Sequence, residues 1–163
     1  MAALHRSRCW GENNQGQLGL GHDYKKGHSS SPPHRMGDYL EYVNLGEDKA
    51  KEVACGSQNT CVLLTNNRVK CWGSSTGALG YGDTERRGRT EDTTPDKLPY
   101  VNLGTGLTPL HLFASSSQAQ FCVIFDNGGI KCWGYTESPT STEDMWIGDD
   151  PGEMGDALPY LNL

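Results

Sequence analysis

The sequence predicts an all-β protein made of repeated units, and three observations support that fold class. The tripeptide Cys-Trp-Gly occurs at 9–11, 71–73 and 132–134, with spacings of 62 and 61 residues. Other blocks recur around it in the same order. Short apolar runs are separated by turn sequences, and no long stretch has helical periodicity. Self-similarity at a fixed period indicates one structural unit repeated along the chain.

A glycine-rich block of the form Gly-x-Leu-Gly-x-Gly follows the tripeptide, at 16–21 and again at 77–82. The block holds too much glycine for a helix interior, where each glycine costs stability. It predicts a tight turn in which two backbones approach closely. In each copy the leucine, Leu18 or Leu79, is expected to point into the core.

A second block, Leu-x-Tyr-x-Asn-Leu, is found at 40–45, 98–103 and 158–163, with leucine in place of the middle valine in the last copy. Its alternation of apolar and polar residues predicts a short strand. Proline in two of the copies stands near the strand start, where a lost N–H matters least. Between these blocks, residues 49–54 are expected to form one helical turn at most.

Two segments predict β-hairpins. The first spans 61–72 and places an apolar run before the turn Thr65–Arg68 and an alternating run after it. The second spans 122–133 around the turn Asp126–Gly129, in which asparagine and glycine accept positive φ. Both hairpins end on the Cys-Trp of the repeated tripeptide.

These blocks resemble the repeat of the regulator of chromosome condensation family. Trp-Gly-Glu-Asn-Asn-Gln-Gly-Gln-Leu-Gly at 10–19 is very like the family signature, and residues 53–63 are similar to the segment that opens the next repeat. The resemblance covers nearly the whole chain. It implies β-propeller blades of short antiparallel strands, as in a seven-bladed propeller. The third copy departs from the pattern, because residues 135–139 replace the glycine-rich turn.

We expect a single partial propeller domain over 1–163, with repeat units at about 9–70, 71–131 and 132–163, the last incomplete. Propellers typically close with four to eight blades, whereas this chain holds two full units. The sequence is therefore expected to be a fragment of a longer propeller. Open blade edges would then be covered by the rest of the propeller or by self-association. A small protein that closes by oligomerising is the alternative.

The positions of four cysteines in the sequence predict two pairs. Cys61 and Cys71 flank the first hairpin, and Cys122 and Cys132 flank the second at the same separation. Each pair should lie directly opposite on adjacent strands, close enough for a disulfide. Two such disulfides would favour an oxidising compartment, secretory or extracellular. Free, buried thiols in the cytosol or nucleus are the alternative.

The remaining cysteines, Cys9 and Cys55, have no equivalent pairing. A partner for Cys9 would precede the first residue in this pattern, and a Cys9–Cys55 bridge is a second option. The spacing Cys-x5-Cys-x9-Cys does not match a structural zinc site. The histidines at 22, 28 and 34 are expected to be solvated loop residues.

The tryptophans of the three tripeptides, Trp10, Trp72 and Trp133, are expected to be packing anchors between blades. Trp146 lies outside the repeat and is a weaker candidate for a contact site. The acidic segment 149–156 is either a polar loop or, less in keeping with its pattern, a calcium loop.

The net charge of the chain and the motifs that it lacks exclude several classes of function. The formal net charge is −6, and basic clusters occur only in polar loops at 25–26 and 86–89, so a nucleic-acid partner is not expected. No apolar run reaches membrane-spanning length, and the start lacks the apolar stretch of a signal peptide. No nucleophile elbow, phosphate loop or metalloprotease motif is present. We expect neither an enzyme nor a cofactor.

Two functions remain. The first is a non-catalytic β-propeller scaffold that presents long loops to a protein partner, since binding residues are often carried on loops of a rigid frame. The alternative, implied by the resemblance, is a guanine-nucleotide exchange regulator of a small GTPase, as in the name-giving member. No residue here maps onto an exchange site. A gene fragment without a function is a third possibility.

Overall fold

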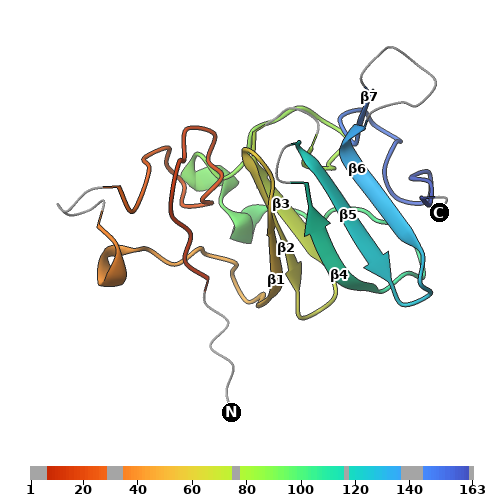
Figure 1. Ribbon diagram of the computed structural model, residues 1–163, viewed down its shortest axis with the longest axis horizontal. Coiled ribbons are helices and arrows are strands. Elements are labelled where there is room, and N and C mark those ends of the chain that lie inside the picture. The colour runs from red at the N-terminus through yellow and green to blue at the C-terminus, as the bar shows by residue number, and fades with distance from the viewer. Residues whose placement is uncertain (1–6, 29–34, 75–77, 116–117, 137–144, 162–163) are drawn as a thin grey trace.

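The computed structural model describes residues 7–28, 35–74, 78–115, 118–136 and 145–161. Two antiparallel sheets lie side by side (Figure 1). The first contains β1 (Ala50–Cys55), β2 (Asn59–Leu64) and β3 (Val69–Gly73), in that order. The second contains β4 (Pro109–Ala114), β5 (Gln120–Phe125), β6 (Ile130–Thr136) and β7 (Met145–Ile147). Single 3-10 turns occur at η1 (Gly37–Tyr39), η2 (Glu91–Thr93) and η3 (Pro95–Lys97).

The all-β expectation is confirmed, and the two hairpins have the same register. Cys61 lies opposite Cys71 in the first sheet, and Cys122 lies opposite Cys132 in the second. Strands β1 and β4 both carry a bulge next to their first residue. The sheets are therefore two copies of one structural unit. Within the described residues no helix is both long and apolar enough to cross a membrane.

The main core is shared by both sheets. Leu63 and Val69 of the first sheet belong to the same buried cluster as Phe121, Val123 and Trp133 of the second. A smaller cluster on the other side of the first sheet contains Trp72, among others. Burial of apolar area from both units holds them together, at about 25 cal/mol per Å² removed from water.

Two expectations about local structure are wrong. Residues 49–54 form no helical turn, because Ala50–Cys55 is strand β1 and pairs with β2. The block expected to be a strand at 40–45, 98–103 and 158–163 is not one in any copy within the described residues; Tyr42 and Tyr160 form only isolated bridges, with Arg8 and Lys131. Pro99 has no N–H to donate, and the Leu98 N–H closes η3 instead. What remains of the pairing is one hydrogen bond, from Val101 N–H to the Val69 carbonyl at 2.8 Å.

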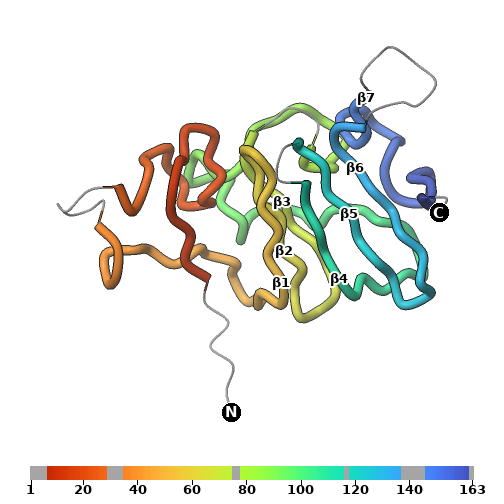
Figure 2. The backbone as a smooth tube through the Cα atoms, viewed as in Figure 1, coloured from red at the N-terminus to blue at the C-terminus, as the bar shows by residue number. Residues whose placement is uncertain are grey.

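The repeated tripeptide ends the third strand of each unit. Gly73 is the last residue of β3, and Gly134 occupies the matching position in β6. Residues 7–11 take the same place ahead of the first sheet and continue into the loop 12–28. Figure 2 shows this segment, in red and orange, to one side of the first sheet.

Candidate functional site

The buried motif tryptophans dock onto the preceding repeat. Trp72 is 2% exposed, and its Nε1–H donates to the Gln17 carbonyl at 3.0 Å. Trp133 is fully buried, and its Nε1–H donates to the Ala78 carbonyl at 3.1 Å. Each acceptor lies 55 residues before its tryptophan. Both belong to the glycine-rich turn, so each turn receives the tryptophan of the next unit.

The two leucines of these turns are buried, as Leu18 is 4% and Leu79 is 1% exposed. The glycine after each leucine makes room for the indole. A Cβ on Gly19 would lie 2.7 Å from Trp72 Nε1, and a Cβ on Gly80 would lie 2.9 Å from the same atom of Trp133. The turn sequence is therefore explained by the tryptophan that it receives.

Trp10 is exposed, unlike the other two motif tryptophans. Its side chain is 60% exposed, and within the described residues no glycine-rich turn covers it. The ring is nevertheless placed like that of Trp72. Trp10 lies against Gly27 of its own unit, as Trp72 lies against Gly88, with virtual Cβ to Cδ1 distances of 3.4 and 3.1 Å. One face of the indole is thus supported, and the face that docks in the other units is open.

A pocket of about 520 Å³ lies beside Trp10. One wall comes from residues 7–18 and the other from residues 53–60, which are the end of β1, the turn after it and the start of β2. Val53 of this second wall is 46% exposed although it lies on a strand. We call residues 7–28 together with 53–60 the N-terminal surface.

Cys9 and Cys55 both line this pocket, and both are free thiols. A Cys9–Cys55 bridge, which the sequence left as one option, is therefore absent. Burial raises the pKa of the Cys9 thiol to about 11, and the nearby Cys55 adds to the increase. Cys55 is exposed. Because the thiolate is the reactive form, Cys55 should be the more reactive thiol toward small reagents.

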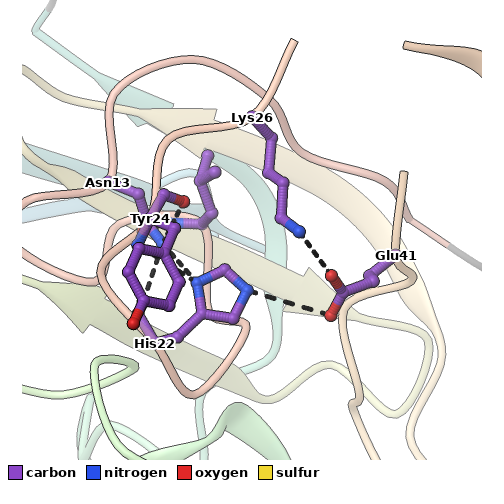
Figure 3. Close-up of polar contacts among 6 residues, drawn as sticks. Asn13, His22, Tyr24, Lys26 and Glu41 are labelled. Atoms are coloured by element: carbon purple, nitrogen blue, oxygen red, sulfur yellow. Dashed lines mark hydrogen bonds and ion pairs between the residues drawn. The ribbon is translucent and has the colours of Figure 1, made fainter. Parts of the chain in front are cut away.

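Asn13 organises the loop that carries this surface (Figure 3). Its side chain is fully buried, and Nδ2 donates to the carbonyls of His22 at 2.7 Å and Tyr24 at 3.2 Å. Its Oδ1 accepts the Leu18 N–H at 2.9 Å. One asparagine therefore ties the glycine-rich turn to the far side of the loop.

A histidine in the same loop faces an ion pair between Lys26 and Glu41 (Figure 3). The Nδ1 of His22 accepts the Tyr24 N–H at 3.2 Å, so the proton of the neutral ring is on Nε2. That Nε2 is buried and lies 3.8 Å from Glu41, too far for a hydrogen bond. Burial lowers the pKa of His22; Glu41 opposes this shift and Lys26 reinforces it.

An ion pair between units holds the loop from its other side. Arg89 Nη2 donates to Asp23 Oδ2 at 2.7 Å, across 66 residues of sequence. This contact lowers the pKa of the Asp23 carboxyl. Part of the basic cluster 86–89 is thus engaged within the molecule.

Both predicted hairpin disulfides are present, Cys61–Cys71 and Cys122–Cys132. In each, the Cα atoms are 4.1 Å apart. The Tyr81 hydroxyl accepts the Cys71 N–H at 3.0 Å and donates to its carbonyl at 3.1 Å. The Cys71 backbone therefore points away from β2, which makes Cys61–Cys71 a non-hydrogen-bonded pair.

Sequence reasoning missed a contact that recurs in every unit. A cation on the third strand lies over the tyrosine of the Leu-x-Tyr block, an arrangement that favours the cation electrostatically. The pairs and their distances to the ring centroid are Arg8–Tyr42 (4.3 Å), Lys70–Tyr100 (5.1 Å) and Lys131–Tyr160 (5.1 Å). The recurrence of a cation two residues before each tryptophan was the available signal.

The other candidate residues give no site. Glu153 in the acidic segment closes its own loop, as Oε2 accepts the Gly148 N–H at 2.7 Å. Among the described residues no group of three or more His, Cys, Asp or Glu side chains could hold a metal ion. His34 lies outside the described residues. Trp146 is partly buried and packs edge-on against Tyr135, with centroids 5.3 Å apart, so it is no open contact site.

The sequence pattern of the Regulator of chromosome condensation (RCC1) repeat matches residues 9–63, and a second form of it matches residues 50–77. The chain contains repeats of this family. The human and mouse E3 ubiquitin-protein ligase HERC2 are each 26% identical over 126 residues, which is 77% of this chain and 2% of the ligase.

Solved structures show the same fold. The crystal structure of human WBSCR16 aligns with a TM-score of 0.57 and 17% identity over 88% of this chain. Yeast RCC1 (Prp20), solved bound to Kap60, aligns with a TM-score of 0.57 and 18% identity over 94%. The chain spans about a third of each, 33% and 32%. Its sheets are thus blades of an RCC1-like β-propeller.

A further structure is Prp20p from Saccharomyces cerevisiae, with a TM-score of 0.54 and 17% identity over 98% of this chain and 36% of that protein. Its published description concerns binding to Gsp1p and histones.

Proposed function

We propose that this RCC1-repeat chain is a non-catalytic scaffold that binds a protein partner through its N-terminal surface. The observation that carries the proposal is the open face of Trp10. Its counterparts are 2% and 0% exposed because another repeat packs on them, whereas Trp10 is 60% exposed in an equivalent orientation. A preorganised indole with one bare face loses little side-chain entropy when a partner covers it.

The surroundings of Trp10 suit a protein contact. Tyr24 is 63% exposed on the same loop, and Val53 lies across the pocket. Tryptophan and tyrosine are enriched among the residues that contribute most to binding energy. The Asn13 hydrogen bonds and the Asp23–Arg89 ion pair hold the loop in place. A fixed frame reduces the ordering cost of association.

The known complexes of similar proteins are consistent with the proposal that this chain binds a protein partner. Yeast RCC1 (Prp20) has been crystallised with Kap60, and Prp20p has been studied for binding to Gsp1p and histones. A binding role and an exchange role on a small GTPase both fit this fold, since fold alone does not fix function. The exposed apolar residues favour binding, because they offer contact area and no group that would act on a nucleotide.

Site-specific photo-crosslinking in cells tests the proposal. A photoreactive phenylalanine at position 24 should give discrete adducts with one or a few proteins. Binding of the purified partner should weaken at least tenfold in Trp10→Ser. The matched control is Phe113→Ser, which removes a 50% exposed aromatic from β4, outside the N-terminal surface. Equal weakening by both substitutions would contradict the proposed site.

The exchange alternative has its own assay. Release of a fluorescent guanine nucleotide from small GTPases should not be accelerated by the purified chain. A catalytic, substoichiometric acceleration would overturn the non-catalytic part of the proposal and leave the binding part to be tested separately.

A further inference from the structure

A threonine in the segment between the two sheets, Thr94, is followed by Pro95 and, three positions after the threonine, by Lys97. Thr94 lies between the single turns η2 and η3 and not in a strand. Its backbone is extended, with φ −64° and ψ 151°, as the following proline favours. The threonine is therefore part of a segment without strand pairing, from which it can be presented to an enzyme.

The two ends of the Thr94 side chain face different surroundings. Its methyl group packs against the first repeat, because Cγ2 would lie 3.1 Å from a Cβ on Gly21. Its Oγ1–H donates to the Glu91 carbonyl at 3.0 Å, in an exposed part of the segment. The ammonium group of Lys97, an exposed residue, donates to the same carbonyl oxygen. The hydroxyl and the ammonium are therefore neighbours on the exposed side of the segment.

A phosphoryl group on Oγ1 would fit this arrangement. It adds a charge of about −1.5 to −2 and three acceptor oxygens. Carboxylates of the same segment oppose the added charge, and Lys97 is the only cationic residue in the sequence 91–97. Its ammonium can pair with the phosphoryl oxygens in a charge-assisted hydrogen bond. Because the methyl group makes the contact with Gly21, that packing is compatible with a modified hydroxyl.

We propose that Thr94 is phosphorylated by a proline-directed protein kinase, with ATP as the phosphoryl donor. The proline distinguishes this site chemically, because a binding cleft that offers no acceptor at that position rejects residues that bring an unpaired N–H. The lysine adds an ion pair with an anionic group of the kinase. This inference does not depend on the proposed binding function.

The transfer exchanges one P–O bond for another. Thr94 Oγ1 attacks the γ-phosphorus of ATP, and the hydroxyl proton passes to a carboxylate base of the kinase. The bond between the γ-phosphorus and the oxygen that bridges it to the β-phosphorus breaks, and ADP leaves. The chain supplies the hydroxyl, the proline and the lysine, and the kinase supplies the base and the bound Mg²⁺–ATP.

Access to the hydroxyl requires local opening of the segment. Pro95 is buried, and its Cγ would lie 3.0 Å from a Cβ on Gly19. The turn that starts at Thr94 is closed by local backbone bonds, such as that from the Lys97 N–H to the Thr94 carbonyl at 2.9 Å. Segments of this kind open at a lower free energy than paired strands. The folded chain should therefore react, and more slowly than a free peptide of the same sequence.

Thr108 also precedes a proline and is the internal comparison. Its N–H donates to Asp126 Oδ1 at 3.4 Å, and its carbonyl accepts the Asp126 N–H at 3.0 Å. Pro109 is the first residue of β4 and lies opposite Phe125. The third residue after Thr108 is His111, not lysine or arginine. Presenting Thr108 to a kinase would require part of the second sheet to open.

The test uses the full chain with its disulfides intact, Mg²⁺–ATP, and a cyclin-dependent kinase as the proline-directed probe. Phosphorylated positions are mapped and quantified by mass spectrometry. We expect the initial rate at Thr94 to be at least tenfold higher than at Thr108. A synthetic peptide with the sequence of residues 90–100 is phosphorylated in parallel.

Lys97→Gln should lower the rate at Thr94 at least fivefold in both the chain and the peptide. The matched control is Lys49→Gln, which replaces an exposed lysine just before β1 and should leave the rate unchanged. A fold loosened by Lys97→Gln would raise the rate, so a lower rate reports recognition by the kinase. Phosphorylation of the peptide but not of the chain, equal rates at Thr94 and Thr108, or no effect of Lys97→Gln would overturn the proposal.

Discussion

Each buried motif tryptophan lies against a glycine of the preceding repeat, and this single contact explains two parts of the repeat sequence. The indole needs a carbonyl acceptor and a flat surface, and Gly19 supplies the second because it has no Cβ. Its backbone also has a positive φ of +69°, which favours glycine independently of packing. The two reasons can be separated by substitution.

Replacing Gly19 with alanine should destabilise the fold by about 2–4 kcal/mol, from the positive φ and from the clash with Trp72. The control is Gly106→Ala, since Gly106 has nearly the same φ, +68°, and nothing within 4 Å of its virtual Cβ. That change should cost only about 1–2 kcal/mol. Urea denaturation measures both. Equal losses would show that the tryptophan contact contributes little.

The partly buried ring of His22 predicts a pH dependence of stability. Its pKa in the folded chain is below the ordinary value of 6.5, so the unfolded chain binds the proton more readily. The stabilising contribution is complete above pH 6.5 and is lost as pH falls through the lowered pKa of the folded chain. His22→Asn keeps an acceptor for the Tyr24 N–H and does not titrate. The free energy of unfolding, measured from pH 7.5 to 4.5, should therefore fall more steeply in the parent chain; parallel curves would contradict this.

At the scale of elements, the spacing of residues in the sequence predicts the structure correctly where the contacts are local. The turn residues at 65–68 and the cysteines on either side fixed the hairpin register and its disulfide. Spacing failed at 98–103, where alternation predicted a strand. There Pro99 has no N–H to donate, and the Leu98 N–H bonds to the Pro95 carbonyl. Proline is not the whole reason, because the copy at 40–45 has Glu41 in its place and also forms only an isolated bridge, at Tyr42. Residues 49–54 became a strand because β2 offered an edge, which is a tertiary effect.

The hairpin disulfides should contribute similarly to stability. Each links cysteines 10 residues apart, and closing so short a loop is worth about 2–3 kcal/mol in the chain-entropy model. The double substitution Cys61→Ala with Cys71→Ala should lower the free energy of unfolding by that amount. Cys55→Ser, which removes the exposed free thiol, should change it by less than about 0.5 kcal/mol. A large effect of this control would indicate that the Cys55 thiol is part of the core.

At the scale of the whole molecule, the N-terminal surface was not predictable from the repeat. The pattern predicts the same packing role for Trp10, Trp72 and Trp133. Trp72 and Trp133 are buried against the turn of the repeat before them, and Trp10 is exposed because no such turn lies against it among the described residues. The repeat sequence determines that each unit has a tryptophan able to pack on a glycine-rich turn. Whether that tryptophan is buried depends on whether such a turn lies next to it.

The shared core also determines how the molecule unfolds. Repeat arrays can lose their units one at a time when each unit is stable alone. Here Leu63 and Phe121 belong to one buried cluster, and Trp133 of the second sheet bonds to the turn before it. We therefore expect a single transition. With fluorotryptophan incorporated, the ¹⁹F signals of Trp72 and Trp133 should change at the same urea concentration. Phe121→Leu should lower both midpoints equally, although the substitution lies in the second sheet. A shift of the Trp133 midpoint alone would mean that the two blades are independent folding units, and that the interface between them stabilises neither one.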